Sequence, residues 1–349
     1  MPREIVTTDG SSFRIRSMEL PPLGPRDVRV RTRFAAPKHG TETHSILGSP
    51  FDFNRWDRRL RMFLPREEEE AAAPRDERPV GNIAVGVVTE VGPEVSRWRT
   101  GDAVFGYGRI REVNQALEDV WRPLAGLSDE DAVCVDPAHV AFVAVRDGKV
   151  RIGDHVAVFG LGAIGLMAAQ VARAGGARRV FVIDPLEMRR NCAAAHGADA
   201  ALDPLACDAA LAIKEATDGA GVDVSIETSG SARALHEAIR CIRQCGTVVH
   251  VPWGPRDCAE LHLDEEFHLN RPTLVGSQAW PGWGNPDRDY PVWDWERASA
   301  AAADLLRDGL IASSGVVTPI VSFDEAPEAL PAMFTRPETT IKLGVRFAE

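Results

Sequence analysis

Residues 155–165 read HVAVFGLGAIG, and this stretch decides how the second half of the 349-residue chain folds. Five residues of strand character run directly into a glycine-rich turn, and an alanine-rich segment of helical character follows. A strand that passes through Gly-x-Gly-x-x-Gly into a helix is typical of a dinucleotide-binding turn. Gly160 permits the tight turn, Gly162 lets a pyrophosphate approach the backbone, and Gly165 allows the helix to pack closely on the strand. The pyrophosphate would lie at the helix N-terminus, where free N–H groups favour negative charge.

An acidic residue closes the next strand-like run. Asp184 follows the apolar residues 180–183 and comes 24 positions after Gly160 (184 − 160 = 24). A carboxylate at this point accepts hydrogen bonds from both ribose hydroxyls of the adenosine and repels a 2′-phosphate. The sequence therefore predicts NAD as the cofactor, in preference to NADP.

Strand-like and helix-like segments alternate from about residue 150 onward, whereas the first third of the chain contains short β-rich runs. Strands that alternate with helices are typical of βαβ units and a parallel sheet, so the sequence predicts an α/β fold. In the alternating part we expect strands at 155–159, 180–183, 222–227, 248–251 and 273–277, and helices at 164–174, 186–196, 232–243 and 298–306. Elsewhere we expect strands at 28–33, 84–92, 102–106 and 341–345.

Charge and cysteine content exclude several classes of protein. The formal net charge is −11, from 40 Lys and Arg against 51 Asp and Glu, which argues against a nucleic-acid or anionic-membrane binder. Six cysteines without a C-x-x-C pair are too few for a disulfide scaffold and fit the reducing cytoplasm. Residues 1–10 lack the apolar segment of a signal peptide, and glycines interrupt the longest apolar stretch, residues 156–172. We expect a two-domain cytoplasmic enzyme with neither a nucleic acid nor a membrane as its partner.

Further motifs resemble the medium-chain dehydrogenase/reductase superfamily, in particular its alcohol and polyol dehydrogenase branch. Gly101-Asp102-Ala103-Val104 is similar to the family's G-D-x-V strand, and residues 81–92 are similar to its G-H-E…G-x-V-x-x-x-G segment. Residues 222–230 are similar to V-D-x-x-x-E-x-x-G, and residues 246–249 to the strand that follows. Several ordered motifs at compatible spacing are more specific than any one of them alone.

The resemblance implies a GroES-like β-rich catalytic domain and a Rossmann cofactor domain with a doubly wound parallel sheet. It implies domain limits of 1–146 for the first part of the catalytic domain, 147–280 for the cofactor domain and 281–349 for the return to the catalytic domain. Strand 273–277 resembles the one through which family members pair across a dimer, so a homodimer or homotetramer is expected. The cofactor contacts that it implies are Gly160, Gly162, Ala163, Ile164, Gly165, Asp184, Arg189, Thr228, Pro252 and Trp253.

The positions that hold catalytic zinc in the family are altered here. His39, in the segment His39-Gly40-Thr41-Glu42-Thr43-His44, stands where zinc-containing members have a cysteine. Asn82 replaces the histidine of the G-H-E turn, and Asp136 stands at the third ligand position. Asparagine is a poor zinc ligand and the set lacks a thiolate, so we expect no bound catalytic zinc. The structural zinc lobe is also expected to be absent, because residues 107–124 contain no cysteine.

Alcohol oxidation without zinc still needs a base and a group that stabilises the alkoxide-like oxygen. By the resemblance, Thr41 links the substrate hydroxyl to the cofactor ribose, and His44 ends the proton relay with an ordinary pKa near 6.5. His39 is then a candidate base or hydrogen-bond donor in the place of the metal, oriented by Asp136. Lys38 is a candidate source of positive charge, or a base if desolvation lowers its pKa.

Two segments bear on the substrate, and each has two interpretations. Residues 51–63 mix aromatics with arginines, including Arg55 and Trp56, which fits a lid over a sugar ring or an anionic group. The alternative is a surface helix or a subunit contact. After strand 273–277, Gln278 and Trp280 open a tryptophan-rich stretch that suits a polyhydroxylated ring, whereas such stretches also occur in interfaces and cores. With these residues, Asn82 is a candidate substrate contact.

The sequence therefore predicts an NAD-dependent, zinc-independent dehydrogenase for a secondary alcohol of a sugar, polyol or cyclitol-like substrate, with a small polar alcohol as its partner. A zinc-free quinone or enoyl reductase is one alternative, although such enzymes usually prefer NADPH, which Asp184 opposes. A non-catalytic NAD-binding protein is another, because fold alone does not decide function.

Overall fold

The computed structural model describes the chain except for residues 39, 41–49, 67–76, 255–256, 285 and 349. The described residues form two compact units. The first unit combines residues 1–133 with residues 317–349, and the second unit consists of residues 134–316. Both ends of the chain therefore fold together, and the second unit interrupts the first in the sequence.

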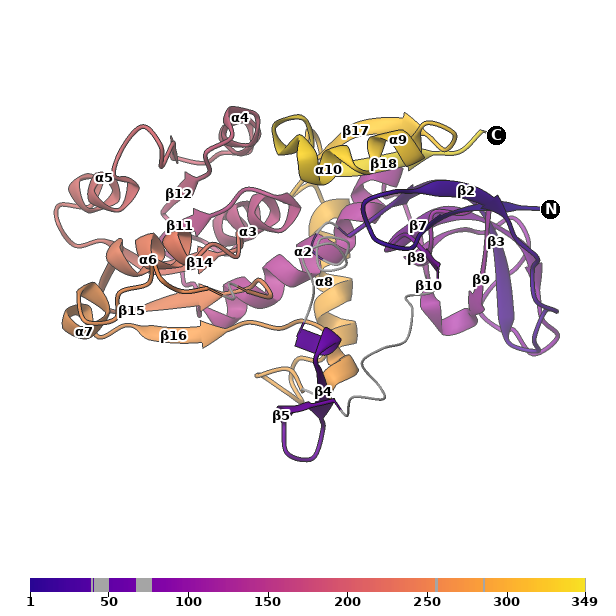
Figure 1. The fold of residues 1–349 in the computed structure, drawn as a ribbon, viewed down its shortest axis with the longest axis horizontal. Coiled ribbons are helices and arrows are strands. Elements are labelled where there is room, and N and C mark those ends of the chain that lie inside the picture. Colours follow the sequence, from indigo (N-terminus) through magenta and orange to yellow (C-terminus); the bar gives the residue numbers. More distant parts are fainter. Residues whose placement is uncertain (39, 41–49, 67–76, 255–256, 285, 349) are drawn as a thin grey trace. The chain divides into compact units, whose positions relative to one another are not determined.

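A six-stranded sheet is the centre of the second unit (Figure 1). The strands follow the order β13–β12–β11–β14–β15–β16, and each neighbouring pair is parallel. From β11 the sheet extends through β12 and β13 on one side and through β14, β15 and β16 on the other, so the order of strands reverses between β11 and β14. This arrangement confirms the predicted doubly wound sheet. Ligands of such sheets bind outside the carboxyl ends of the strands at this point. The strands are β11 (His155–Phe159), β12 (Arg179–Ile183), β13 (Ala200–Leu202), β14 (Val222–Glu227), β15 (Ile242–His250) and β16 (Thr273–Gly276).

Helices connect these strands, as the alternating pattern predicts. The helices predicted at 164–174 and 186–196 are confirmed to within one residue at each end. The helix predicted at 232–243 is wrong at its C-terminus, because Ile242 already belongs to β15 and its side chain is fully buried in the core. The helices are α3 (Ala163–Ala174), α4 (Glu187–Ala195), α5 (Ala209–Ala216), α6 (Ala232–Arg240), α7 (Glu266–Asn270) and α8 (Trp295–Arg307).

Strand β11 is apolar after its first residue. Val156, Ala157, Val158 and Phe159 are at most 1% exposed, so both faces of the strand are covered. A strand buried on both faces reads as a continuous apolar run rather than an alternating one, which is typical of parallel sheets. The interior of β14 does contain a polar residue, Ser225, whose buried hydroxyl donates to the Ala238 carbonyl at 2.8 Å.

The sequence does not predict α2 (Asp129–Asp147), which begins in the first unit and continues into the second. Pro137 lies inside this helix, and proline removes a backbone donor and disfavours a helix interior. The helix is nevertheless stabilised by burial, since Ala138 and Ala141 are fully buried. Tertiary packing thus outweighs local propensity here.

The C-terminal end of α2 anchors the tryptophan-rich segment. The guanidinium groups of Arg146 and Arg297 each lie 4.1 Å from the centre of the Trp293 ring, within cation–π range. Arg288 Nε pairs with the Asp147 carboxylate at 3.1 Å. The second unit, residues 134–316, extends beyond residues 147–280 at both ends. The predicted domain limits stay a prediction.

The first unit contains a seven-stranded sheet of order β10–β8–β7–β3–β18–β17, in which β9 also pairs with β3, and a three-stranded sheet of order β2–β1–β6. The C-terminal strand β18 lies antiparallel to β3, with Val345 opposite Ala35, so the two ends of the chain share one sheet. The strands are β1 (Arg3–Thr7), β2 (Arg14–Ser17), β3 (Asp27–Ala36), β6 (Arg78–Pro79), β7 (Ile83–Val91), β8 (Ala103–Tyr107), β9 (Val113–Leu117), β10 (Trp121–Pro123), β17 (Val317–Ser322) and β18 (Lys342–Arg346). Short helical turns of this unit are η2 (Glu118–Val120), α9 (Ala326–Ala329), α10 (Ala332–Thr335) and η4 (Pro337–Thr339), whereas η3 (Pro281–Trp283) belongs to the second unit.

The segment 51–63 forms a hairpin, so the surface-helix interpretation is wrong. After the short turn η1 (Pro50–Asp52), β4 (Asn54–Asp57) pairs antiparallel with β5 (Met62–Pro65). The rings of Trp56 and Phe63, directly opposite in register, meet edge to face at 5.2 Å. This aromatic cross-strand pair favours a two-stranded structure over a helix.

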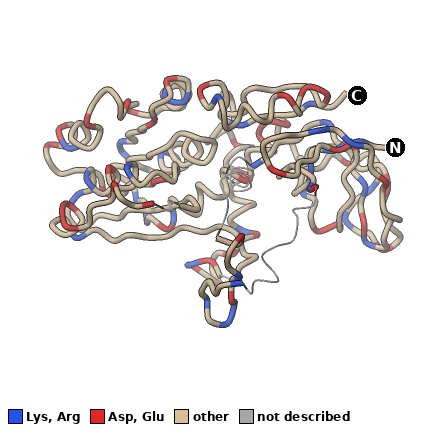
Figure 2. Tube along the Cα trace, in the orientation of Figure 1, with Lys and Arg blue, Asp and Glu red and all other residues tan. Residues whose placement is uncertain are grey.

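Charged residues of both signs are interspersed along the trace of each unit (Figure 2). Several form close ion pairs, such as Arg16 with Glu4 at 2.7 Å and Arg240 with Asp208 at 2.9 Å. In the described part of the chain, no helix combines the length and the apolar character that crossing a bilayer requires.

A substitution at Gly86 in β7 tests how closely the backbones of β7 and β3 approach each other. A Cβ at Gly86 would lie 2.0 Å from the carbonyl oxygen of Arg31, so we expect Gly86→Ala to lower the free energy of unfolding by roughly 2–3 kcal/mol. The matched control is Gly276→Ala in β16, where a Cβ would meet no atom within 4 Å and the change should stay within about 0.5 kcal/mol. Urea unfolding of both variants measures the difference, and equal stability would contradict the close approach.

Candidate functional site

The glycine-rich turn is tightly packed at two glycines and open at the third. Gly160 has φ +84°, and a Cβ on it would lie 2.7 Å from the Cβ of Ser229. A Cβ on Gly165 would lie 1.8 Å from the carbonyl oxygen of Gly160. At Gly162, which precedes α3, a Cβ would meet no atom within 4 Å. The turn therefore leaves free space at the N-terminus of α3, where a pyrophosphate would bind.

Asp184 organises the same turn from the carboxyl end of β12. Its carboxylate is buried and accepts the Leu161 N–H at 2.7 Å and the Leu186 N–H at 2.8 Å, one on each oxygen. Since a carboxylate has about four lone-pair positions, acceptor capacity remains for ribose hydroxyls. Arg189 Nη1 lies 3.8 Å from Asp184, and burial lowers the pKa of this guanidinium although the charge of Asp184 opposes the effect.

Thr228 connects the turn to the carboxyl end of β14. Its hydroxyl donates to the Gly160 carbonyl at 2.7 Å, and its N–H donates to the Phe159 carbonyl at 2.8 Å. Ala163 and Ile164 form the first turn of α3. The structure thus brings together the predicted cofactor residues of three neighbouring strand ends, and their contact with a cofactor stays a prediction.

Two residues at this edge were missed by the sequence reasoning. Glu227, the last residue of β14, is fully buried, and its Oε2 lies 3.0 Å from Nδ1 of His250, the last residue of β15. The glutamate of the V-D-x-x-x-E-x-x-G motif was a usable signal, whereas a single histidine at a strand end carries none. Their proximity depends on the register of the two strands.

The predicted contacts beyond β15 and β16 lie on partly exposed loops. Pro252 is half-buried, and Trp253 is exposed and meets the Trp283 ring edge to face at 5.9 Å. Gln278 and Trp280 follow β16; the amide oxygen of Gln278 accepts the Trp280 N–H, and both side chains are exposed. This arrangement leaves aromatic and amide groups accessible beside the carboxyl ends of the strands.

The predicted catalytic residues are only partly described. His39, Thr41 and His44 lie outside the described residues. Lys38 is half-buried after β3, and the Asn82 N–H donates to the Ala36 carbonyl at 3.0 Å, so Asn82 lies beside the same segment.

The remaining predicted residues have different surroundings. Asn82 Nδ2 is buried and has no hydrogen-bond partner among the described residues. Asp136 is 5% exposed on α2 in the second unit. Arg55 is exposed on β4 with Asp57 at 3.7 Å, and Trp56 packs on the neighbouring strand.

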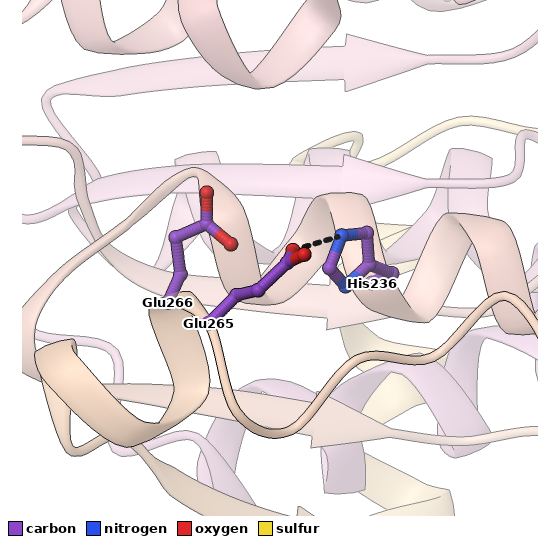
Figure 3. A group of neighbouring side chains, drawn as sticks. All are labelled: His236, Glu265 and Glu266. Carbon is purple, nitrogen blue, oxygen red and sulfur yellow. Dashed lines mark ion pairs between the residues drawn. The ribbon is translucent and has the colours of Figure 1, made fainter.

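A cluster of His236, Glu265 and Glu266 is another group that the sequence reasoning missed (Figure 3). One ligand atom from each lies within 4.8 Å of the others, and His236 Nε2 is 3.6 Å from Glu265 Oε2. Arg240 Nε already lies 3.5 Å from Glu266 Oε1. The cluster is therefore part of an ion-pair network between α6 and α7.

Comparison with known proteins relates this geometry to a family. D-guloside 3-dehydrogenase of Escherichia coli (strain K12) is 38% identical over 331 residues, which cover 92% of this chain and 93% of that protein. The sequence pattern of the zinc-binding dehydrogenase family matches residues 163–288. The chain belongs to the medium-chain dehydrogenase/reductase superfamily.

Solved structures of other dehydrogenases share the fold. A zinc-binding dehydrogenase from Sinorhizobium meliloti 1021 bound to NADP has a TM-score of 0.76 at 22% identity, with 99% of each chain covered. An alcohol dehydrogenase from Escherichia coli CFT073 complexed with NADH has a TM-score of 0.76 at 18% identity, with 99% of each chain covered. The predicted combination of a GroES-like and a Rossmann domain is confirmed for this medium-chain dehydrogenase, and so is the prediction of an oxidoreductase that acts on CH–OH groups.

A substitution at Gly162 distinguishes a role of the turn in cofactor binding from a role in folding. We expect Gly162→Ala to change the free energy of unfolding by no more than about 0.5 kcal/mol, because its Cβ meets nothing. If this turn binds a pyrophosphate as predicted, the same methyl group would intrude on it, and the dissociation constant for NADH should rise roughly tenfold or more. Calorimetric titration with NADH measures the effect.

Gly165→Ala is the contrasting variant, because its Cβ would collide with the Gly160 carbonyl. It should lose roughly 3 kcal/mol of stability. Unchanged NADH binding by a folded Gly162→Ala protein would contradict a pyrophosphate site at this turn.

Proposed function

We propose that this medium-chain dehydrogenase uses NAD to oxidise a secondary alcohol of a sugar, polyol or cyclitol-like substrate, without a catalytic zinc ion. The observation that carries the proposal is the open turn at Gly162 with the buried carboxylate of Asp184 attached to it. The substrate class is supported by the 38% identity to D-guloside 3-dehydrogenase over most of both chains.

The residues of the turn fit a dinucleotide. Free space at Gly162 and the N-terminus of the twelve-residue helix α3 suit the pyrophosphate. Asp184 would accept hydrogen bonds from the adenosine ribose, and its negative charge disfavours a 2′-phosphate at the same place. When bound, NAD supplies the acceptor for the hydride that leaves the carbinol carbon.

The residues at the family's zinc positions do not fit a zinc site. Asn82 presents a buried side-chain N–H group that has no partner among the described residues, and an N–H donor requires an acceptor oxygen rather than a cation. No thiolate is available at residues 39, 82 or 136. We therefore assign Asn82 to the substrate, as a donor to a hydroxyl oxygen.

Without a zinc ion, side chains must remove the proton of the substrate hydroxyl. In this proposal Thr41 accepts a hydrogen bond from the substrate hydroxyl and passes its own proton along the relay to His44. His39, with Asp136, orients the substrate oxygen, and Lys38 adds positive charge where negative charge develops on that oxygen. Arg55, Trp56, Gln278 and Trp280 are the proposed contacts to the rest of the substrate.

The proposal also includes a homo-oligomeric state and a cytoplasmic location. β16 is the last strand of its sheet, and Leu274 on it is 44% exposed, which supports pairing of two copies into a homodimer or homotetramer. All six cysteines are free thiols, which supports a cytoplasmic location.

NAD reduction in the presence of a chelator tests the proposed chemistry. Purified protein should reduce NAD with one or more members of a panel of glycosides, polyols and cyclitols, and EDTA should leave the rate unchanged, because no step depends on a metal. Absorbance of the NADH formed measures the rate. Loss of activity in EDTA with recovery on added zinc would overturn the zinc-free mechanism, and NADPH oxidation by quinones or enones without alcohol turnover would overturn the substrate class.

The same NAD reduction assay, applied to His39→Ala, tests the role of His39 in the reaction. The substitution should lower kcat by roughly 10²–10³-fold, which is the range for loss of one group that stabilises the developing negative charge on the substrate oxygen, while NADH binding is retained. Unchanged turnover would remove His39 from the mechanism.

The relative affinity for NADH and NADPH tests the proposed role of Asp184 in cofactor selection. Wild-type protein should bind NADH at least roughly tenfold more tightly than NADPH, and Asp184→Asn should reduce that ratio, because the amide lacks the negative charge. Asp199→Asn is the matched control, since Asp199 accepts the Val180 N–H at the opposite end of β12. Fluorescence titration gives both dissociation constants, and an equal ratio in wild type and Asp184→Asn would contradict the proposed role.

A further inference from the structure

Glu227 and His250 occupy paired positions at the carboxyl ends of β14 and β15. The Glu227 side chain is fully buried, and the His250 side chain is 21% exposed. The Glu227 Oε2 atom lies 3.0 Å from His250 Nδ1. A buried carboxylate is costly unless it is paired, so this contact is the natural partner of its charge.

The geometry of His250 favours the protonated ring. Its second nitrogen, Nε2, contacts the carbonyl oxygen of Gly254. His250 Nδ1 and Glu227 Oε2 are close enough for an ion pair but do not have hydrogen-bond geometry, so this contact is attractive only when the ring is protonated, whereas the contact to Gly254 requires a single N–H. Burial lowers the pKa of His250, but the Glu227 carboxylate together with the Gly254 carbonyl raises it above its ordinary value.

The pair connects two loops that follow neighbouring strands. Glu227 Oε1 accepts the Ser229 N–H at 2.6 Å, the Ser229 hydroxyl at 2.5 Å and the Gly230 N–H at 3.0 Å, which orders the loop 228–231. His250 holds the loop 251–254 through the Gly254 carbonyl. The ion pair between Glu227 and His250 therefore links two groups that each hold one of these loops.

These loops contact one another and the dinucleotide turn. A Cβ on Gly230 would lie 3.5 Å from the Cβ of Pro252, and a Cβ on Gly254 would lie 3.8 Å from the carbonyl oxygen of Gly230. Ser229 is the residue against which Gly160 packs, at 2.7 Å for a Cβ on that glycine. A change at His250 can thus reach the turn through two packed contacts.

Other charged groups near this pair are already paired with one another. On the side of β16, the Ser277 N–H donates to the His250 carbonyl at 2.8 Å, and beyond it Asp147, to which the Ser277 side chain hydrogen bonds, pairs with Arg288. On the side of β14, Glu227 is the titratable group that acts on the imidazole. Glu227 is therefore the charged group that opposes the effect of burial on the pKa of His250.

We propose that protonated His250, ion-paired with Glu227 and hydrogen-bonded to the Gly254 carbonyl, is a positioning residue that holds both loops against the dinucleotide turn and thereby sets the affinity for the nicotinamide cofactor. The inference rests on the proposed function, because it concerns binding at that same turn. On deprotonation the ring loses its positive charge, and its attraction to the Glu227 carboxylate is lost.

The direction of the pH effect follows from this arrangement. The folded-state pKa of His250 is raised, so its contribution is complete below the ordinary value of about 6.5 and is lost as the pH rises through the raised value. Loss of an attraction worth about as much as one ordinary hydrogen bond corresponds to a roughly three- to tenfold change in affinity. Cofactor binding should therefore weaken as the solution becomes alkaline.

Titration of cofactor affinity against pH tests the proposal. Between about pH 6 and about pH 9, the dissociation constant of wild-type protein for NADH should rise roughly three- to tenfold. His250→Gln should bind weakly with a flat profile over the same range. Glu227→Gln should move the transition to lower pH, because the neutral amide no longer stabilises the imidazolium, and a merely structural role would not move it. His268→Gln, at an exposed histidine on α7, should keep the wild-type profile.

Amide hydrogen exchange of Val251, Trp253 and Gly254, measured without nucleotide and corrected for the intrinsic pH dependence, is the second readout. It should accelerate at high pH in wild type and be fast at every pH in His250→Gln. A flat wild-type affinity profile with NADH bound would overturn the coupling and leave the proposed function intact. Absence of nucleotide binding at every pH, with exchange still responding, would overturn the proposed function and the coupling with it. Identical profiles for wild type and His250→Gln would exclude His250 as the positioning residue.

Discussion

The backbone of α3 approaches the turn after β11 so closely that residue 165 can carry no side chain, since a Cβ there would lie 1.8 Å from the Gly160 carbonyl. This steric constraint directs the helix N-terminus toward the carboxyl edge of the sheet. Asp184 and Thr228 hold the turn from the two adjacent strands, by hydrogen bonds of 2.7 Å to Leu161 and to Gly160. Three strand ends thus determine one turn jointly, and the space at Gly162 is a consequence of their packing.

The same edge concentrates the buried charge of the second unit. The interiors of the parallel strands are covered on both faces, and unpaired polar groups would be costly there. Asp184, Glu227 and His250 stand where the strands end, and each is satisfied by backbone groups of the following loop or by one another. This edge therefore combines buried charge with a turn that offers both free space and helix N–H groups.

Sequence patterns predicted the elements that depend on neighbouring residues. The run 155–165 predicted β11, its turn and α3, and the acid 24 positions after Gly160 is the one whose carboxylate binds the turn. Helix α2 was not predicted, because Pro137 disfavours a helix locally and only burial stabilises it. The composition of segment 51–63 is compatible with a lid, a surface helix or a subunit contact, and cross-strand pairing of Trp56 with Phe63 makes it a hairpin.

What the sequence by itself determined is the glycine-rich turn with its strand and helix, because the steric demands of Gly160 and Gly165 and the apolar periodicity act over a few adjacent residues. What only the tertiary structure decided is which polar groups meet. Glu227 and His250 are 23 residues apart (250 − 227 = 23) and meet because β14 and β15 pair in a particular register. Trp293 belongs to the packing of α2 because Arg146 and Arg297 lie against its ring. Such contacts depend on the register and packing of whole elements, which no short stretch of sequence encodes.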